Sequence, residues 1–136
     1  MPRTCSSHRR PADALVRTPE AALSAVILAT ESGRTACVCV GTVDAERRPG
    51  VLVTVEGAGT PEVPAVVAFV LEGARELTAS LFVASSGPDA TVPDEELFAV
   101  LEGQCREAGV GLLEWFVPVG RFWMAVGERR GRRSQW

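Results

Sequence analysis

The chain has 136 residues, of which 46% are hydrophobic and 23% charged, and its formal net charge is −3. This length and apolar content suit one domain with a single core rather than two, and no uninterrupted apolar run reaches the roughly 18 residues of a membrane span. Lys, Tyr and Asn are absent, a bias against AT-rich codons that indicates a high-GC bacterial or phage genome. The N-terminal residues lack the apolar core of a signal peptide, which predicts a cytoplasmic protein with no membrane association.

Charge is distributed unevenly along the chain. Residues 1–17 carry +3, residues 18–127 carry −9 and residues 128–136 carry +3. We therefore predict a disordered basic tail over 1–17, a single acidic domain over 18–127 and a basic C-terminal tail over 128–136. The tails either bind nucleic acid or an acidic partner, or remain solvated ends that lie on their own acidic body. The arginines that would contact nucleic acid are Arg9, Arg10, Arg129, Arg130, Arg132 and Arg133.

The first predicted helix begins at Thr18-Pro19-Glu20 and runs through Ala29. It is apolar on nearly every side between residues 25 and 29, which predicts burial against the sheet rather than an exposed surface helix. Residues 36–42 and 51–56 read as two strands, and the loop residues between them, including Pro49-Gly50, predict a hairpin.

Two further helices are predicted between strands. The second begins at Thr60-Pro61-Glu62 and the third covers residues 93–108, with three acids at its start and Gly109 placed to cap its end. Strands are predicted at 77–84, 112–117 and 122–126, the last two as a hairpin. The order α-β-β-α-β-α-β-β predicts a single α/β domain with a mixed, about five-stranded sheet, in which the second, third and fourth strands form a parallel group.

Few residues suit catalysis or metal binding. The single His, His8, lies in the predicted tail, and the absence of Lys removes the P-loop motif. A zinc site can be drawn from Cys5, His8, Cys37 and Cys39, but Cys-x-Cys within an apolar strand is typical of small core positions. We predict no catalytic residue, no metal and no cofactor, and a protein that is not an enzyme.

Two groups of residues are candidate sites. Aromatic residues surround the turn between the last two strands, where they could form an exposed binding surface or pack in the core: Trp115, Phe116, Arg121, Phe122 and Trp123. Polar residues near the carboxyl ends of strands mark where a small molecule would bind: Glu56, Gly57, Thr60, Ser85, Ser86 and Asp89. Acids at the two adjoining helix starts disfavour an anionic ligand there.

Three stretches resemble the actinobacterial domain-of-unknown-function family 4192. Residues 17–23, Arg-Thr-Pro-Glu-Ala-Ala-Leu, look like the family's opening helix start, residues 27–40 like its helix-loop-strand passage, and residues 113–125, with Arg121-Phe122-Trp123, like its hairpin. The resemblance implies an α/β fold in a truncated or divergent member. Because the family has no assigned activity, no catalytic residue is implied.

These observations leave three hypotheses on function. The first is a protein-binding or self-associating module, a homodimer being one form, that uses the last hairpin or an exposed sheet edge. The second is a nucleic-acid-associated protein that uses the Arg-rich ends. The third is a small-molecule-binding domain or enzyme with its site at the strand ends.

Overall fold

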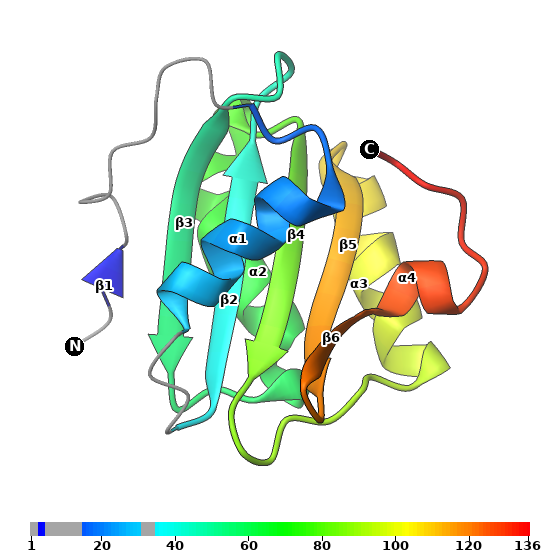
Figure 1. Ribbon diagram of the computed structural model, residues 1–136. Coiled ribbons are helices and arrows are strands. Elements are labelled where there is room, and N and C mark those ends of the chain that lie inside the picture. Colours follow the sequence, from blue (N-terminus) through cyan, green and yellow to red (C-terminus); the bar gives the residue numbers. More distant parts are fainter. Residues whose placement is uncertain (1–2, 5–14, 31–34) are drawn as a thin grey trace.

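The computed structural model describes residues 3–4, 15–30 and 35–136, which form one mixed β-sheet with helices on both faces (Figure 1). The strands are β1 (Arg3–Thr4), β2 (Cys37–Val43), β3 (Pro49–Glu56), β4 (Ser80–Ser86), β5 (Gly111–Val119) and β6 (Phe122–Ala125). The helices are α1 (Pro19–Ala29), α2 (Val63–Ala74), α3 (Glu95–Ala108) and α4 (Val126–Arg129), with short 3₁₀ turns at Thr60–Glu62 and Arg75–Leu77. The predicted order of three helices and five strands is confirmed, and the two-residue β1 and the short α4 are additions to it.

The strand order across the sheet is β1-β3-β2-β4-β5-β6. β2 lies between β3 and β4 and is antiparallel to both, whereas β4 and β5 are parallel neighbours. The three strands expected to form a parallel group, β3, β4 and β5, all run in the same direction, but β2 lies between β3 and β4, so only β4 and β5 pair as parallel neighbours. Burial explains the difference, because all of β2 is buried while β3 is exposed over its first three residues, so β2 takes the inner position.

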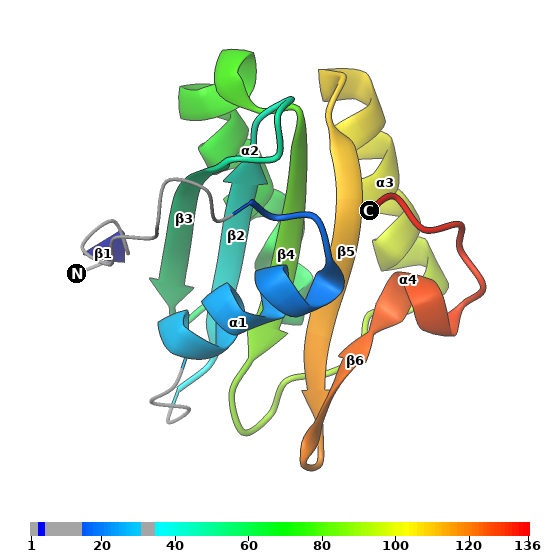
Figure 2. The ribbon, with the colours of Figure 1, turned by 45° about the horizontal axis from the view of Figure 1, so that its top comes forward.

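Two helical layers cover opposite faces of the sheet. α1 lies alone on one face, and α2 and α3 lie together on the other (Figures 1 and 2). The cluster under α1 includes Ala22, Val26, Cys39, Phe82 and Phe116. The larger cluster on the other face includes Val67, Val83, Phe98, Leu101 and Trp115. Because both faces of the central strands are covered, these strands are apolar throughout rather than alternating.

Capping residues set the helix ends as the sequence predicts. Thr18 Oγ1 accepts a hydrogen bond from the Ala21 N–H at 3.2 Å, and Asp94 Oδ1 accepts one from the Leu97 N–H at 2.8 Å. Gly109 ends α3 in the left-handed conformation, at φ 72°. None of the helices in residues 15–30 and 35–136 has the length and apolar character that a membrane span requires.

The C-terminal segment, residues 126–136, folds back along the part of β5 that β6 leaves uncovered (Figure 1). β6 pairs only with residues 116–119 of β5, and beyond this pairing Arg132 Nη1 donates to the Leu112 carbonyl at 3.2 Å. Trp136 packs against the cluster under α1, and Arg47 Nη2 donates to the Gln135 carbonyl at 2.8 Å. The segment expected to be a basic tail is thus part of the folded domain.

Candidate interaction surface

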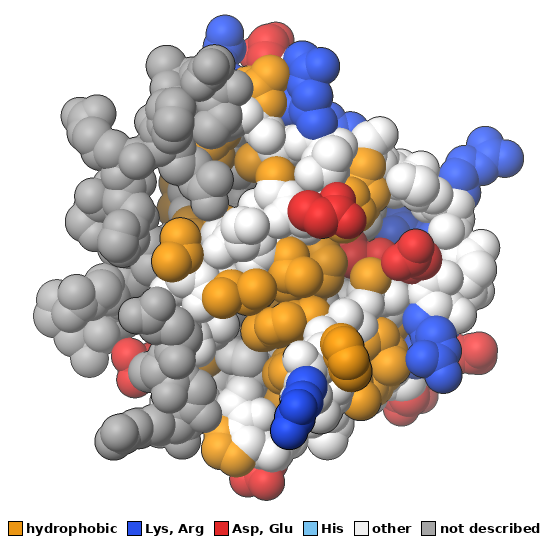
Figure 3. Space-filling model, in the orientation of Figure 1, with side chains coloured by type: hydrophobic (Ala, Val, Ile, Leu, Met, Phe, Trp, Pro, Cys, Tyr) orange, Lys and Arg blue, Asp and Glu red, His pale blue; other side chains and the backbone are white. Residues whose placement is uncertain are grey.

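The outward side of α1 is apolar and exposed to solvent. Its inward side chains, Ala22 and Val26, are fully buried, whereas Ile27 and Leu28 are 44% and 55% exposed. The helix packs against the sheet, as predicted, but the predicted burial is wrong for this side, because in the described residues no second layer covers it. We call Leu23, Ser24, Ile27 and Leu28 the α1 surface; apolar side chains gather in the middle of this face (Figure 3).

The α1 surface has neither a charge nor an unpaired side-chain hydroxyl. Residues 21–30 contain no charged side chain. The Ser24 hydroxyl donates to the Glu20 carbonyl at 2.9 Å, and the Thr30 hydroxyl donates to the Val26 carbonyl at 2.8 Å, so both are satisfied within the helix. Removal of water from this surface would therefore leave no side-chain donor without an acceptor, which lowers the cost of covering it.

Apolar side chains and a small cavity lie beside α1. Trp123 and Trp136 are partly buried and pack against the same cluster as the inward side of the helix. A cavity of about 80 Å³ lies between the start of α1 and the C-terminal segment, with Pro19, Glu114 and Arg132 in its lining. Its volume suits a few water molecules and is well below the roughly 300–1,000 Å³ of a typical small-molecule site.

The predicted aromatic surface at the last hairpin is divided between core and exterior. Trp115 and Phe116 are 0% and 2% exposed, so their assignment to a contact surface is wrong. The physical reason is that β5 has helices over both faces, which covers both of its alternating rows of side chains. Arg121 and Phe122 are exposed, with Phe122 at 78%, and Trp123 is partly buried.

Two of the predicted strand-end residues are joined by hydrogen bonds in the interior. Ser85 is fully buried and Thr60 is 3% exposed, and their hydroxyl oxygens lie 3.0 Å apart. Thr60 Oγ1 also lies 2.7 Å from the Thr91 carbonyl, and Trp115 Nε1 donates to Ser85 Oγ at 3.0 Å. Each hydroxyl has one proton, so Thr60 donates to Thr91, Ser85 donates to Thr60 and Trp115 donates to Ser85.

This chain of hydrogen bonds uses both hydroxyls to join the loops to the core. In the described structure, no side-chain hydrogen bond joins Glu56, Ser86 or Asp89 to Thr60 or Ser85, and Gly57 has no side chain. Glu56 and Asp89 are exposed, Ser86 is buried, and the Gly57 N–H donates to the Ala36 carbonyl at 2.7 Å. The geometry favours a structural role for Thr60 and Ser85.

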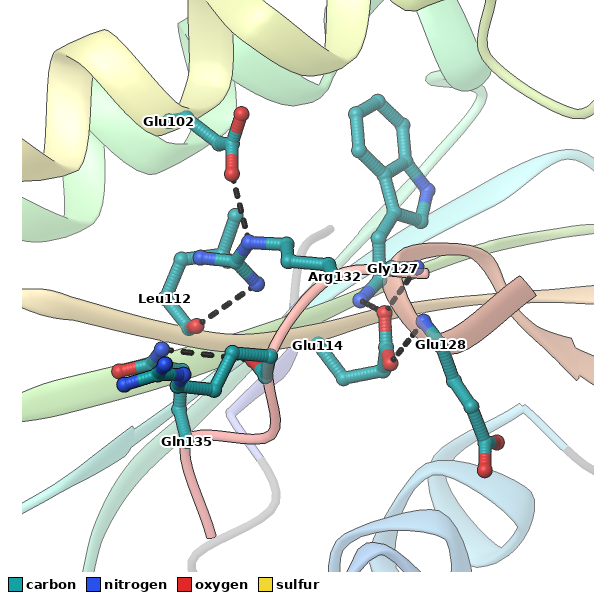
Figure 4. A network of polar contacts seen from close by, with 9 residues as sticks. Glu102, Leu112, Glu114, Gly127, Glu128, Arg132 and Gln135 are labelled. Atoms are coloured by element: carbon teal, nitrogen blue, oxygen red, sulfur yellow. Dashed lines mark hydrogen bonds and ion pairs between the residues drawn. The ribbon is translucent and has the colours of Figure 1, made fainter. Parts of the chain in front are cut away.

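Glu114 is a buried carboxylate that the sequence analysis did not single out. It is 5% exposed, and its Oε1 accepts hydrogen bonds from the N–H groups of Trp115 at 2.9 Å and Gly127 at 2.6 Å (Figure 4). Its Oε2 accepts from the Glu128 N–H at 3.2 Å. The carboxylate thereby satisfies the first N–H groups of α4 and holds the C-terminal segment on the sheet. A lone acid within an apolar strand was the sequence signal for this role.

Two of the predicted nucleic-acid arginines have partners within the domain. Arg132 Nε lies 2.6 Å from Glu102 Oε2, and Arg130 donates to the Pro93 carbonyl. The guanidinium groups of both arginines lie 5.6 Å from the centre of the Phe98 ring. Arg129, Arg130 and Arg133 are exposed, whereas Arg9 and Arg10 lie outside the described residues.

The cysteines of the described region are buried. Cys37 and Cys39 belong to β2, and Cys105 lies in α3 with 2% exposure. Burial raises the pKa of the Cys105 thiol to about 11, an effect that Arg132 opposes and Glu102 adds to. The region that the structure describes contains no group of three His, Cys, Asp or Glu residues placed to hold a metal ion. Cys5 and His8 lie outside it.

Comparisons with known proteins do not assign the chain to a family. No protein-family model matches the chain, and no curated protein matches it. The resemblance to family 4192 therefore rests on the quoted motifs alone and stays a prediction.

Proposed function

We propose that this protein is a non-enzymatic protein-binding module whose contact site is the α1 surface. The observation that carries the proposal is the exposure of Ile27 and Leu28 on a helix with no charge from residue 21 to residue 30. A helix that is apolar on nearly every side is normally covered on every side. Here one side lacks a covering layer among the described residues, and a partner protein would supply it.

The expected gain from covering this surface is modest. Complete burial of a Leu or Ile side chain contributes about 1.5–3 kcal/mol, so burying the exposed halves of Ile27 and Leu28 contributes about 1 kcal/mol each. Because association itself costs at least about 4 kcal/mol, these two side chains alone are insufficient. Trp123 and Trp136, which are partly exposed beside α1, provide the remaining apolar area in this proposal.

A pair of matched substitutions tests the proposal. Ile27→Asp places a charge in the α1 surface, whereas Phe69→Asp places the same charge at a side chain that is 68% exposed on α2, on the opposite face. We expect proteins captured from the source cell by the unchanged chain and by Phe69→Asp to be absent with Ile27→Asp. Circular dichroism checks that both variants fold. Capture of the same proteins by all three chains would contradict the proposal.

The other two hypotheses have less support in the geometry. Nucleic-acid binding through the C-terminal arginines would have to rely on Arg129 and Arg133, since Arg130 and Arg132 bind within the domain. A small-molecule site at the strand ends would have to recruit hydroxyls that Thr60 and Ser85 already use. The hairpin residues Arg121 and Phe122 are retained as a second contact region, exposed near Trp123.

A further inference from the structure

We propose that the partner of the α1 surface is a second copy of this chain, packed through its own α1 about a twofold axis. This inference rests on the proposed function and names the occupant of the same site. In a twofold dimer each surface meets itself, so a self-associating surface must be complementary to its own copy. Three observations indicate that the α1 surface meets this condition.

The first observation is the distribution of charge over the two helical layers. Two copies of an acidic domain repel each other wherever their acidic faces meet. The layer of α2 and α3 carries several acids, namely Glu72, Glu95, Glu96, Glu102 and Glu107, whereas α1 carries only Glu20, at its first turn. The α1 layer is therefore the helical face on which two copies place the fewest acids against each other, with Glu20 as the one acid of its helix.

The second observation is the pattern of side chains on the α1 surface. Leu23 and Ile27 are four residues apart, and so are Ser24 and Leu28, so the surface consists of two adjacent ridges. Such ridges pack into the grooves of an identical helix at a crossing angle of about −50°. Ser24 lies between the larger side chains, and its small size allows close approach of two helix axes.

The third observation concerns hydrogen bonding. Because the Ser24 hydroxyl donates to the Glu20 carbonyl, burial of Ser24 at the helix crossing leaves no unpaired donor. The surface also lacks the Lys and Arg residues that accompany helices bound to a membrane surface, so a lipid bilayer is a poorer occupant than a protein.

The size of the surface sets the expected affinity. α1 has 11 residues and is about 16 Å long, so two such helices bury a small interface even with Trp123 beside them. Interfaces below about 1,200 Å² belong to weak associations, and we therefore expect a monomer–dimer equilibrium with a Kd between about 10 µM and about 1 mM.

Sedimentation velocity of the full-length chain over that concentration range tests the inference. We expect the unchanged chain and Phe69→Asp to dimerise alike, and Ile27→Asp to weaken the dimer at least tenfold. A chain that stays monomeric at the highest concentration would overturn the inference. If Ile27→Asp still abolished capture of other proteins in that case, the proposed function would stand without a second copy. Equal dimerisation of all three chains would place the contact elsewhere and overturn the inference as well.

Cross-linking gives a second readout that does not depend on an acidic substitution. In a Cys5→Ser background, Ser24→Cys places a thiol at the expected twofold axis, while Cys37, Cys39 and Cys105 are buried. We expect mild oxidation to give a covalent dimer with Ser24→Cys, and none with Phe69→Cys on the opposite face. Equal cross-linking of both variants would indicate random collision and contradict the α1 contact.

Discussion

The buried carboxylate of Glu114 gives the sharpest test of how the C-terminal segment is held. In the variant Glu114→Ala, the N–H groups of Trp115, Gly127 and Glu128 lose their shared acceptor. The first two hydrogen bonds are buried, whereas the Glu128 N–H is only partly buried and can bind water instead. Each buried N–H left unsatisfied costs about 1–3 kcal/mol, so for these two groups we expect the free energy of unfolding to fall by about 2–6 kcal/mol.

The variant Glu114→Gln should lose less, because one carboxamide oxygen can still accept at the Oε1 position. The side-chain NH2 group of the glutamine then takes the Oε2 position and meets the Glu128 N–H, so that two donors face each other. We expect the free energy of unfolding to fall by about 1–2 kcal/mol. Glu128→Gln is the matched control, since the Glu128 side chain is exposed and its substitution should change stability by less than about 0.5 kcal/mol.

Urea denaturation followed by tryptophan fluorescence measures these differences in the free energy of unfolding. Trp115 and Trp136 report on the transition, because they pack in the clusters on opposite faces of the sheet. The expected order of stability is unchanged chain, Glu128→Gln, Glu114→Gln and Glu114→Ala, with the first two nearly equal. A loss below about 1 kcal/mol for Glu114→Ala, or an equal loss for the Glu128 control, would refute this account of the carboxylate.

Three further predictions concern the core. Because burial raises the pKa of Cys105 from 9.0 to about 11, its thiol stays protonated in the folded chain while the unfolded chain ionises. Stability present below pH 9 should therefore decline between pH 9 and pH 11, by about 3 kcal/mol, and Cys105→Ala should remove this decline in alkaline denaturation curves. Ser85→Ala should cost about 1–3 kcal/mol in urea denaturation, because Trp115 Nε1 then lacks its buried acceptor; exposed Ser134→Ala should cost almost nothing. Gly41→Ala should destabilise by about 1–3 kcal/mol, since a Cβ there would lie 2.3 Å from the Phe82 ring, whereas Gly73→Ala, on α2 with no atom within 4 Å, should stabilise by up to about 1 kcal/mol; equal melting temperatures would contradict both.

Local signals in the sequence were sufficient to predict the helices and strands, but not to predict which strands lie next to each other in the sheet. Thr18 and Asp94 predict helix starts because capping depends only on residues within one turn. The position of β2 between β3 and β4 depends instead on which strand of the hairpin can be buried on both faces. Burial on both faces is a property of the assembled layers, and no short stretch of sequence determines it.

The site residues show the same limit. Trp115 and Phe122 both belong to the aromatic group around the last turn, yet one is fully buried and the other is 78% exposed. Their difference arises from position along the hairpin, because Trp115 lies where α3 covers β5 and stacks on Phe98 at 6.2 Å, while Phe122 starts the edge strand β6. Glu114 likewise gains its role from α4, which comes next to it only after the chain folds back.

The clearest difference between expectation and structure lies at α1, and it is also the basis of the functional proposal. A helix with apolar residues on nearly every side is predicted to be buried, and the sheet buries only Ala22, Ala25 and Val26. The sequence retains Ile27 and Leu28 on the outward side, where a solvent-facing helix gains nothing from aliphatic residues. On the opposite layer the outward positions are mixed, because Phe69 and Val100 are exposed there beside acids such as Glu72 and Glu107, whereas residues 21–30 of the α1 layer carry no charge. The proposed association of the α1 surface would remove the contradiction, because it would complete the burial that the helix sequence predicts.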